Sequence, residues 1–228
     1  MKISLCLLVW NELHGCKADV PRLPLTAFDE VYAVDGGSTD GTVEFLGQKG
    51  IPVYRQPKSD LNAAYIHAVE RSTCDAVVVF LPKGTVPPEH VLRFRLLFEA
   101  GNHLVVASRN IHDGRNEEDG QLLRPRKWLV LALSWAVAAM WWREGYRVRD
   151  VLHGFKGFTV DGFRRMAPSD LGLSIDVELV VRSYRLRLQR CEFPTQEAPL
   201  SYSASRFKIL PTGVQLLRYL WRESRRRL

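Results

Sequence analysis

The sequence has few cysteines and no grouping of them that is typical of a metal site. Its four cysteines are far apart in the chain, and no CxxC pair occurs: Cys6, Cys16, Cys74 and Cys191. Zinc sites and disulfide frameworks both require closely and regularly spaced cysteines. The six histidines show no metal-ligand spacing either. These absences argue against a zinc protein or a disulfide-stapled domain and favour a reduced compartment.

The sequence also lacks a linker, an internal repeat and a low-complexity tract. No Pro/Gly/Ser-rich stretch interrupts the 228 residues, so residues 1–228 are predicted to form one domain. The apolar run at the start ends at Asn11 and Glu12, before a signal-peptide core with a small-residue cleavage site could form. We interpret that run as a first β-strand and expect the protein in the cytoplasm.

Acidic residues are too few to balance the basic ones. Thirty-two Lys and Arg stand against 25 Asp and Glu, which gives a net charge of +7. Such a surplus favours an anionic partner, whether nucleic acid, an acidic lipid surface or a phosphorylated ligand. No RNA-binding or helix-turn-helix signature accompanies the charge, so we do not expect nucleic acid.

The first half of the chain, residues 1–110, alternates strand-like and helix-like segments. Short β-branched runs predict buried strands at residues 3–10, 30–34, 52–55, 76–81 and 104–107. Helical apolar spacing lies between them at residues 42–49, 61–72 and 88–100. This alternation predicts an α/β fold with a mostly parallel sheet and flanking helices. Ligands of such sheets bind at the carboxyl ends of the strands.

The most informative string is VDGGSTDGT at residues 34–42, after a predicted strand and before a predicted helix. Gly36 and Gly37 allow the backbone to approach a ligand closely, and Asp40 or Thr39 can cap the following helix. Asp35 is expected to face the cleft, where a carboxylate suits a base N–H or ribose hydroxyls. The alternative is a tight turn with a helix cap and no ligand, because short glycine motifs are weakly specific.

This string and the residues before it resemble the family-2 glycosyltransferases, which are inverting enzymes of the GT-A fold, and within them the dolichyl- or polyprenyl-phosphate sugar transferase branch. In that family the first strand ends in an Asn-Glu pair, matched by Asn11 and Glu12, and the second ends in a DGSTDGT-like turn. The resemblance implies a GT-A-like, Rossmann-type nucleotide half at residues 1–110. It places these residues around the nucleotide sugar: Trp10, Glu12, Asp35, Gly36, Gly37, Asp40 and Arg109.

Further matches to the family follow in the same order, from Ser108 and Arg109 at the end of the nucleotide half into residues 111–228, the expected acceptor and membrane-contacting half. They are Ser108 with Arg109, Arg126 with Ser134, Asp150 with Gly154 and Phe155, Asp176 with Glu178, and Ser205, Arg206 and Phe207. The resemblance implies an acceptor or phosphate site at Arg126, His153, Gly154, Ser205 and Arg206. Guanidinium groups grip phosphates bidentately, which suits Arg109, Arg126 and Arg206.

The sequence departs from the family at the metal-binding DxD motif. Pro87, Pro88 and Glu89 fix the alignment, and counting back puts Leu81 and Lys83 at the two acidic positions. Leu and Lys cannot replace carboxylates as ligands of a hard divalent cation, so we expect no metal cofactor; Mg²⁺ or Mn²⁺ on other carboxylates is the alternative.

Lys83 itself has three interpretations. Its ammonium could stabilise the leaving diphosphate in place of the metal, because electrostatic stabilisation is the main requirement of such a transfer. The site could instead have lost its chemistry, leaving a pseudoenzyme that binds a nucleotide or a lipid. The third interpretation is a solvated loop lysine.

Residues 128–142, WLVLALSWAVAAMWW, are uncharged and flanked by arginines and a lysine. The run is short of the roughly 20 apolar residues of a transmembrane helix, whereas tryptophans and basic flanks are typical of an interfacial helix. A buried core helix is the alternative. The basic tail at residues 216–228 has helical apolar spacing and suits an anionic lipid surface, or is a solvated end.

The combined prediction is transfer of a sugar from a nucleotide sugar to polyprenyl phosphate or another lipid, by a protein peripheral on the cytoplasmic face of a membrane. A phosphate acceptor needs no general base, while a hydroxyl acceptor would need one, for which Asp150 and Asp176 are the candidates. The sequence names neither the sugar, the base, the lipid nor the oligomeric state.

Overall fold

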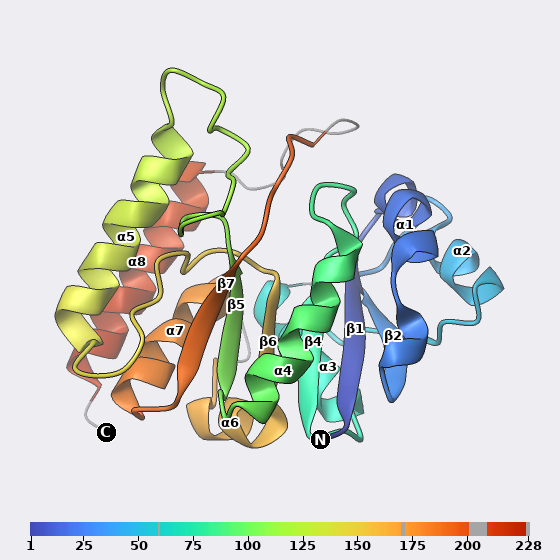
Figure 1. Cartoon of the computed structure of the whole chain (residues 1–228), viewed down its shortest axis with the longest axis horizontal. Coiled ribbons are helices and arrows are strands. Elements are labelled where there is room, and N and C mark those ends of the chain that lie inside the picture. Colours follow the sequence, from blue (N-terminus) through green and yellow to red (C-terminus); the bar gives the residue numbers. More distant parts are fainter. Residues whose placement is uncertain (59, 170–171, 201–208, 227–228) are drawn as a thin grey trace.

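The structure, a computed structural model that describes residues 1–58, 60–169, 172–200 and 209–226, is built around one central sheet (Figure 1). Its strands are β1 (Ile3–Val9), β2 (Glu30–Asp35), β3 (Val53–Arg55), β4 (Ala76–Phe80), β5 (Leu104–Ser108), β6 (Lys156–Thr159) and β7 (Arg190–Pro194). They lie in the order β3-β2-β1-β4-β6-β5-β7. Only β6 runs antiparallel to its neighbours among these strands. The predicted α/β fold with a mostly parallel sheet is confirmed.

Helices cover both faces of the sheet. They are α1 (Leu13–Asp19), α2 (Thr42–Gln48), α3 (Leu61–Arg71), α4 (Arg93–Glu99), α5 (Pro125–Trp141), α6 (Val160–Met166), α7 (Ile175–Arg185) and α8 (Ile209–Arg225), with 3-10 turns η1 (Val20–Arg22), η2 (Leu25–Ala27) and η3 (Pro88–Leu92). The helix predicted at residues 88–100 is therefore a 3-10 turn followed by α4. Pro87 is the N-cap residue of this turn and Pro88 its first residue, a position that favours proline because the N–H it lacks would have no helical partner.

The sequence analysis did not find α1, α6, β6 or β7. α1 is seven residues long and contains Gly15, so its apolar pattern is too short to be recognised. β6 is four residues long and contains Gly157, a residue depleted in strands. Both elements are specified by what they pack against, which the local sequence does not contain.

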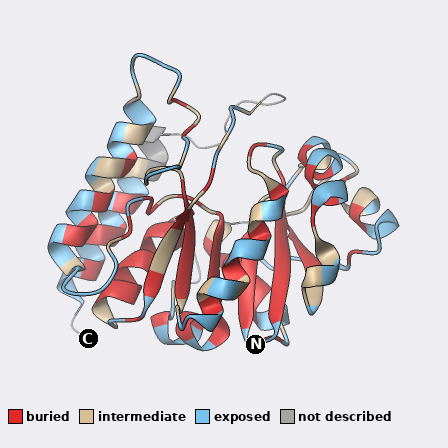
Figure 2. Cartoon of the chain, in the orientation of Figure 1, coloured by how far each residue is buried: buried red, intermediate tan, exposed pale blue. Residues whose placement is uncertain are grey.

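Each strand sends alternate side chains into two separate cores, as the two-residue period of a strand requires. On β1, Cys6 and Leu8 join a cluster with residues of α3, α5, α7 and α8, while Leu5 and Leu7 join one with residues of α1, α2 and α4. Figure 2 shows the resulting buried sheet between more exposed helices. The parallel strands end at one edge of this layer, which places the loops after β1, β2, β4 and β5 together.

Gly157 lies where β6 is inserted between β4 and β5. It pairs with Val78 on one side and Val105 on the other. A Cβ at this position would lie 2.6 Å from Cδ1 of Phe94 and 2.8 Å from Cζ of Phe98 on α4. Only glycine therefore lets α4 pack closely against the strand.

We expect Gly157→Ala to lower the free energy of unfolding by roughly 1–3 kcal/mol, because the added methyl overpacks the α4 interface. Urea unfolding followed by circular dichroism measures the change. Gly47→Ala on α2 is the matched control, since nothing lies within 4 Å of its Cβ position; there we expect a gain of about 0.5–1 kcal/mol. Equal stability of the Gly157→Ala protein and the wild type would contradict the packing argument.

Candidate functional site

The turn after β2 is organised by the carboxylate of Asp35. Its Oδ2 accepts N–H groups from Gly37 at 2.9 Å and Ser38 at 3.0 Å, and its Oδ1 accepts the hydroxyl of Ser38 at 2.5 Å. Gly37 adopts a φ of +96°, a conformation that favours glycine. The side chain of Asp35 is almost fully buried, at 4% exposure. It therefore shapes the turn, whatever it binds.

The same turn is bonded to the loop after β1. Asn11 accepts the N–H of Thr39 at 2.7 Å, and Asp40 accepts the N–H of Leu13 at 3.0 Å and that of Thr42 at 3.1 Å. Partial burial acts to raise the pKa of Asp40, but these hydrogen bonds outweigh it and hold the pKa below its ordinary value. Asp40 thus stays charged while it joins the starts of α1 and α2.

The cap of α2 differs from the prediction. Gly41, with a φ of 93°, is the N-cap residue, and neither Asp40 nor Thr39 occupies that position. Asp40 lies one residue before the N-cap residue, and from there its carboxylate accepts the N–H of Thr42.

Trp10 lies at the same edge and covers the glycine turn. A Cβ on Gly36 would lie 3.1 Å from Cβ of Trp10, so the indole and the turn are in close contact. Trp10 is nevertheless 53% exposed. Glu12, the N-cap residue of α1, is half-buried beside it. An exposed aromatic ring beside a glycine-rich backbone turn is an arrangement suited to a planar ligand.

The loop after β4 carries Leu81 and Lys83. Leu81 is partly buried, and its Cδ1 lies 3.2 Å from the position that a Cβ on Gly154 would take. An apolar side chain packed against Gly154 therefore occupies the first acidic position of the family's DxD motif. Lys83 is half-buried in the loop. No group of three or more His, Cys, Asp or Glu able to hold a metal ion occurs within the described residues. The side chains at these two positions do not fit a divalent cation.

A buried carboxylate fixes the loop of Lys83. Asp19, at the end of α1 and 1% exposed, accepts the N–H of Gly84 at 2.7 Å. Burial raises the pKa of Asp19 to about 6, although the Gly84 hydrogen bond opposes that rise. The loop is therefore anchored through its backbone, which leaves the Lys83 side chain outside the anchoring bonds.

Arg109, directly after β5, is held by two carboxylates. Its Nε and Nη2 donate to Asp150 at 2.8 Å each, and its Nη1 donates to Glu197 at 2.6 Å. Burial acts to raise the pKa of Asp150, but the Arg109 ion pair outweighs it and keeps the pKa well below its usual range. Asp150 is thus a fully buried anion bound to a cation. A general base needs a proton affinity that this carboxylate lacks, so the structure contradicts the assignment of Asp150 as a base.

Glu197 is a member of this cluster that the sequence analysis missed. Its neighbour Ala198 donates a backbone N–H to Thr85 at 2.8 Å, so residues 195–198 connect Arg109 with the loop of Lys83. No sequence motif marks Glu197, because its partner is 88 residues away. Only the return of β7 beside β5 places it here.

The second candidate base, Asp176, lies in a different buried group. It accepts a hydrogen bond from Nζ of Lys156 at 2.8 Å, and Lys156 is completely buried. Tyr65 lies between this pair and Gly154, donating to the carbonyl of Gly154 at 2.8 Å. The buried pair of Lys156 and Asp176 therefore lies next to Tyr65, which bonds the backbone of Gly154.

His153 is packed rather than exposed. Its Nδ1 bonds to the carbonyl of Ala107, which can only accept, so Nδ1 carries the proton. Burial lowers the pKa of His153, and the nearby Arg109 lowers it further, so the ring is neutral. His153 is therefore a buried neutral residue, and its expected contact with an acceptor phosphate stays a prediction.

Of the remaining expected acceptor residues, Arg126 alone lies within the described part of the chain. Arg126, in the first turn of α5, forms an ion pair with Glu117 at 2.9 Å and is half-exposed. Ser205 and Arg206 lie outside the described residues. The roles proposed for these three residues therefore remain predictions.

We expect Asp19→Asn to stabilise the protein at pH 7.5 by roughly 2 kcal/mol and to have a much smaller effect at pH 4. Since the folded pKa is raised above the unfolded value, the folded state binds more protons between about pH 4 and 6, and wild-type stability falls as pH rises through that window. The asparagine keeps an acceptor for Gly84 without the buried charge. Unfolding free energies across pH measure the difference.

The exposed Asp161→Asn is the control for the loss of one charge. A benefit of Asp19→Asn that is independent of pH would show that Asp19 titrates normally.

Comparison with known proteins supplies the family. Glycosyl transferase family 2 matches residues 10–171. Glycosyltransferase AglJ of Haloferax volcanii is 28% identical over 199 residues, which cover 86% of this chain and 63% of AglJ. The chain thus spans less than two thirds of that relative.

Two solved structures of glucosyl-3-phosphoglycerate synthase from Mycobacterium tuberculosis are similar in fold. The complex with Mn²⁺ and UDP-glucose gives a TM-score of 0.71 at 17% identity, covering 98% of this chain and 79% of that one. The complex that also holds phosphoglyceric acid gives 0.72 at 18% identity, with the same coverage. At such identities the likeness shows the fold alone. The family match, however, runs from the end of β1 through the acceptor-side segment and β6, and the chain therefore belongs to glycosyl transferase family 2.

Proposed function

We propose that this protein transfers a sugar from a nucleotide sugar to a phosphate-bearing lipid at a membrane surface, with inversion and without a divalent metal. The observation that carries the proposal is the loop after β4, where a lysine stands at a metal-ligand position, between the glycine turn and the Arg109 cluster. In the reaction, an acceptor oxygen attacks the anomeric carbon. The bond from that carbon to the diphosphate breaks, and its electron pair leaves with the diphosphate.

The donor side is assigned to Trp10 and the Asp35 turn. The indole of Trp10 offers an exposed face for the base, and Gly36 and Gly37 leave the backbone accessible. Asp35 is bonded to its own turn, yet a carboxylate has about four lone-pair positions and can accept further bonds from ribose or base. Structural relatives that bind UDP-glucose support this assignment.

Lys83 is assigned to the leaving diphosphate. Negative charge grows on that group as the sugar departs, so a cation placed there stabilises the transition state more than the bound substrate. A lysine ammonium supplies the charge without coordination geometry. Leu81 excludes a ligand from the other position of the acidic pair.

Arg109 is assigned to the acceptor phosphate. A guanidinium has five N–H donors, and the bonds to Asp150 and Glu197 use three of them, which leaves two for a phosphate. The buried Asp150 cannot serve as a base, which favours an acceptor that is already an anion.

The acceptor is assigned to a membrane because α5 and α8 leave large apolar side chains uncovered. One face of α5 is buried at Val130, Ser134, Val137 and Ala138. The opposite face exposes Trp128, Leu129, Trp135 and Met140, and α8 exposes Val214, Leu217 and Trp221. Trp141, by contrast, packs against the core. In the described part of the chain, no helix meets the length and hydropathy needed to cross a membrane. The exposed apolar faces of α5 and α8 are suited to lying in a membrane–water interface.

We expect transfer to persist in EDTA and not to rise with Mg²⁺ or Mn²⁺, and Lys83→Ala to lower kcat about a hundredfold with little effect on donor affinity. Loss of one cationic donor accounts for roughly 3 kcal/mol of transition-state stabilisation. Turnover is measured with nucleotide sugar and polyprenyl phosphate, and donor affinity by calorimetry.

Lys17→Ala on the adjacent helix α1 is the matched control, because Lys17 is exposed and its substitution removes the same charge. A transferase silenced by EDTA would refute the metal-free mechanism. Donor binding without turnover on any lipid would favour the pseudoenzyme instead.

We expect the protein to float with anionic vesicles and the triple substitution Trp128→Ser, Leu217→Ser and Trp221→Ser to release most of it, because these side chains are 53%, 66% and 57% exposed. Leu96→Ser is the control, since Leu96 is 72% exposed but lies on α4. Equal flotation of all three proteins would show that the α5 and α8 faces do not contact the lipid.

A further inference from the structure

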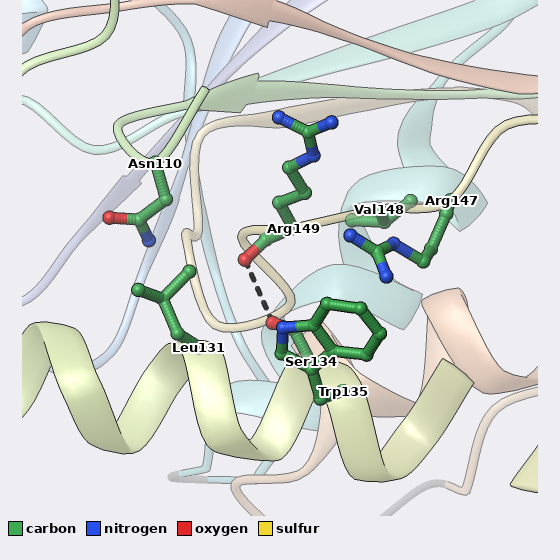
Figure 3. Close-up of a pocket in the computed structure, with 7 residues that line it drawn as sticks. All are labelled: Asn110, Leu131, Ser134, Trp135, Arg147, Val148 and Arg149. Carbon is green, nitrogen blue, oxygen red and sulfur yellow. Dashed lines mark hydrogen bonds between the residues drawn. The ribbon is translucent and has the colours of Figure 1, made fainter. Parts of the chain in front are cut away.

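A pocket of about 190 Å³ lies between α5 and the segment that leads into β6. Its wall on α5 is formed by Leu131, Ser134 and Trp135 (Figure 3). The facing wall is the chain from Arg147 to Arg149, and the remaining side is Asn110, just after β5. We call this space the α5 pocket. Its lining residues do not include those of the glycine turn or Lys83, and the family matches include Ser134 but not Asn110, Trp135 or Arg147.

The amide of Asn110 is the unusual feature of the α5 pocket. Both its Oδ1 and its Nδ2 are buried, and neither has a hydrogen-bond partner among the described residues. Figure 3 shows the amide extending toward Leu131 on α5. Buried polar groups are bonded in nearly all proteins, and each unbonded one destabilises the fold unless something binds it. An amide left unbonded at a pocket wall indicates a ligand with hydrogen-bonding atoms.

The charge of the α5 pocket is positive. Arg147 lies over the ring of Trp135, with 3.8 Å between its guanidinium carbon and the ring centroid. Arg149 extends from the same segment, away from α5 (Figure 3). Within the described residues, neither the half-buried Arg147 nor the exposed Arg149 forms an ion pair with a carboxylate, although most of the other half-buried or buried arginines do. The lining residues include no acid. The pocket is therefore complementary to an anion.

The surroundings of the α5 pocket restrict the size and polarity of that anion. Ser134 already donates to the carbonyls of Val130 and Arg149, both at 2.8 Å, so its hydroxyl fixes the pocket wall. Trp135 is 61% exposed at the mouth, on the same face of α5 as Trp128. A ligand bound here thus has a small polar end inside and continues along an apolar helix face outside.

We propose that the α5 pocket binds the phosphate headgroup of an anionic membrane lipid, with its acyl chains along the exposed face of α5. The ligand phosphate accepts hydrogen bonds from Nδ2 of Asn110 and from Arg147, and a headgroup hydroxyl donates to Oδ1 of Asn110. Trp135 holds the guanidinium in place by its ring face and stands at the level of the headgroups. The inference rests on the membrane location in the proposed function, but it requires neither a donor nor a transfer reaction.

The site would also place the membrane relative to the Arg109 cluster. Asn110 follows Arg109 directly, and Arg149 precedes Asp150, so the pocket and the cluster share both segments of their walls. Lipid bound in the α5 pocket therefore holds the chain segments on which the position of Arg109 depends.

The experiment measures flotation with phosphatidylcholine vesicles that contain or lack phosphatidylglycerol, without any nucleotide sugar. Non-specific electrostatic attraction between basic residues and anionic lipid predicts that removing one basic residue weakens vesicle binding about fivefold. Arg143→Gln, an exposed residue just beyond α5 that does not line the pocket, is the control for that effect. We expect Arg147→Gln to weaken binding to phosphatidylglycerol vesicles by more than about tenfold, because it also removes charge-assisted hydrogen bonds.

Asn110→Leu separates a ligand site from a packing defect. We expect this variant to melt at a higher temperature than wild type, since it removes an unbonded buried amide, and to bind phosphatidylglycerol vesicles at least fivefold more weakly. Circular dichroism checks its folding, and the Arg147→Gln comparison stands if it fails to fold.

Three results would overturn the proposal. The first is an Arg147→Gln protein that binds like Arg143→Gln. The second is an Asn110→Leu protein with a higher melting temperature and unchanged vesicle binding. The third is inorganic phosphate that lowers the flotation of the wild type with phosphatidylglycerol vesicles as much as the Arg147→Gln substitution does, which would make the pocket a site for free phosphate. Loss of transfer with intact vesicle binding would count against the proposed function and not against the pocket.

Discussion

The buried ion pair of Arg109 and Asp150 is the interaction on which the second half of the chain depends. It joins the end of β5 to the segment before β6, and Glu197 adds the segment after β7. Removing one partner of such a pair typically costs about 3–5 kcal/mol, since the other charge stays buried without compensation. β6 enters the sheet antiparallel between β4 and β5, so this contact fixes where the chain turns back. The α5 pocket adjoins this pair, because its lining residues Asn110 and Arg149 are the chain neighbours of Arg109 and Asp150.

Carboxylates have opposite tasks in the two halves of the site. On the donor side, Asp35 and Asp40 are saturated by backbone N–H groups and hold two loops in one geometry. On the acceptor side, Asp150 and Glu197 bind a guanidinium. At the edge between the halves, where the family has two acids, this chain has an apolar contact and a lysine. Metal chemistry is thus replaced by fixed side-chain charge in the mechanism that we propose.

Helix α5 has one face buried in the core and another that exposes large apolar side chains. Its buried stripe packs against α7 and the sheet, as a core helix would, and its other side presents tryptophans to solvent. The seventeen residues of α5 form a helix about 25 Å long, which is shorter than the hydrocarbon core of a bilayer. The same division appears on α8, where Leu216, Tyr219 and Leu220 are buried and Leu217 and Trp221 are exposed.

The sequence by itself determined the strands of the first half, the glycine turn and the loss of the acidic pair. These features are local: a strand has a two-residue period, a turn needs glycine at a positive φ, and a motif has fixed spacing. Only the tertiary structure decided that Asp150 is an ion-pair partner and not a base, that Glu197 belongs to the cluster, and that Gly157 supports an inserted strand. Each of those outcomes depends on a partner far away in the chain, 41 residues for Arg109 and Asp150 and 88 for Arg109 and Glu197. Burial and pairing set the charge state of a side chain, and neither is written in the residues next to it.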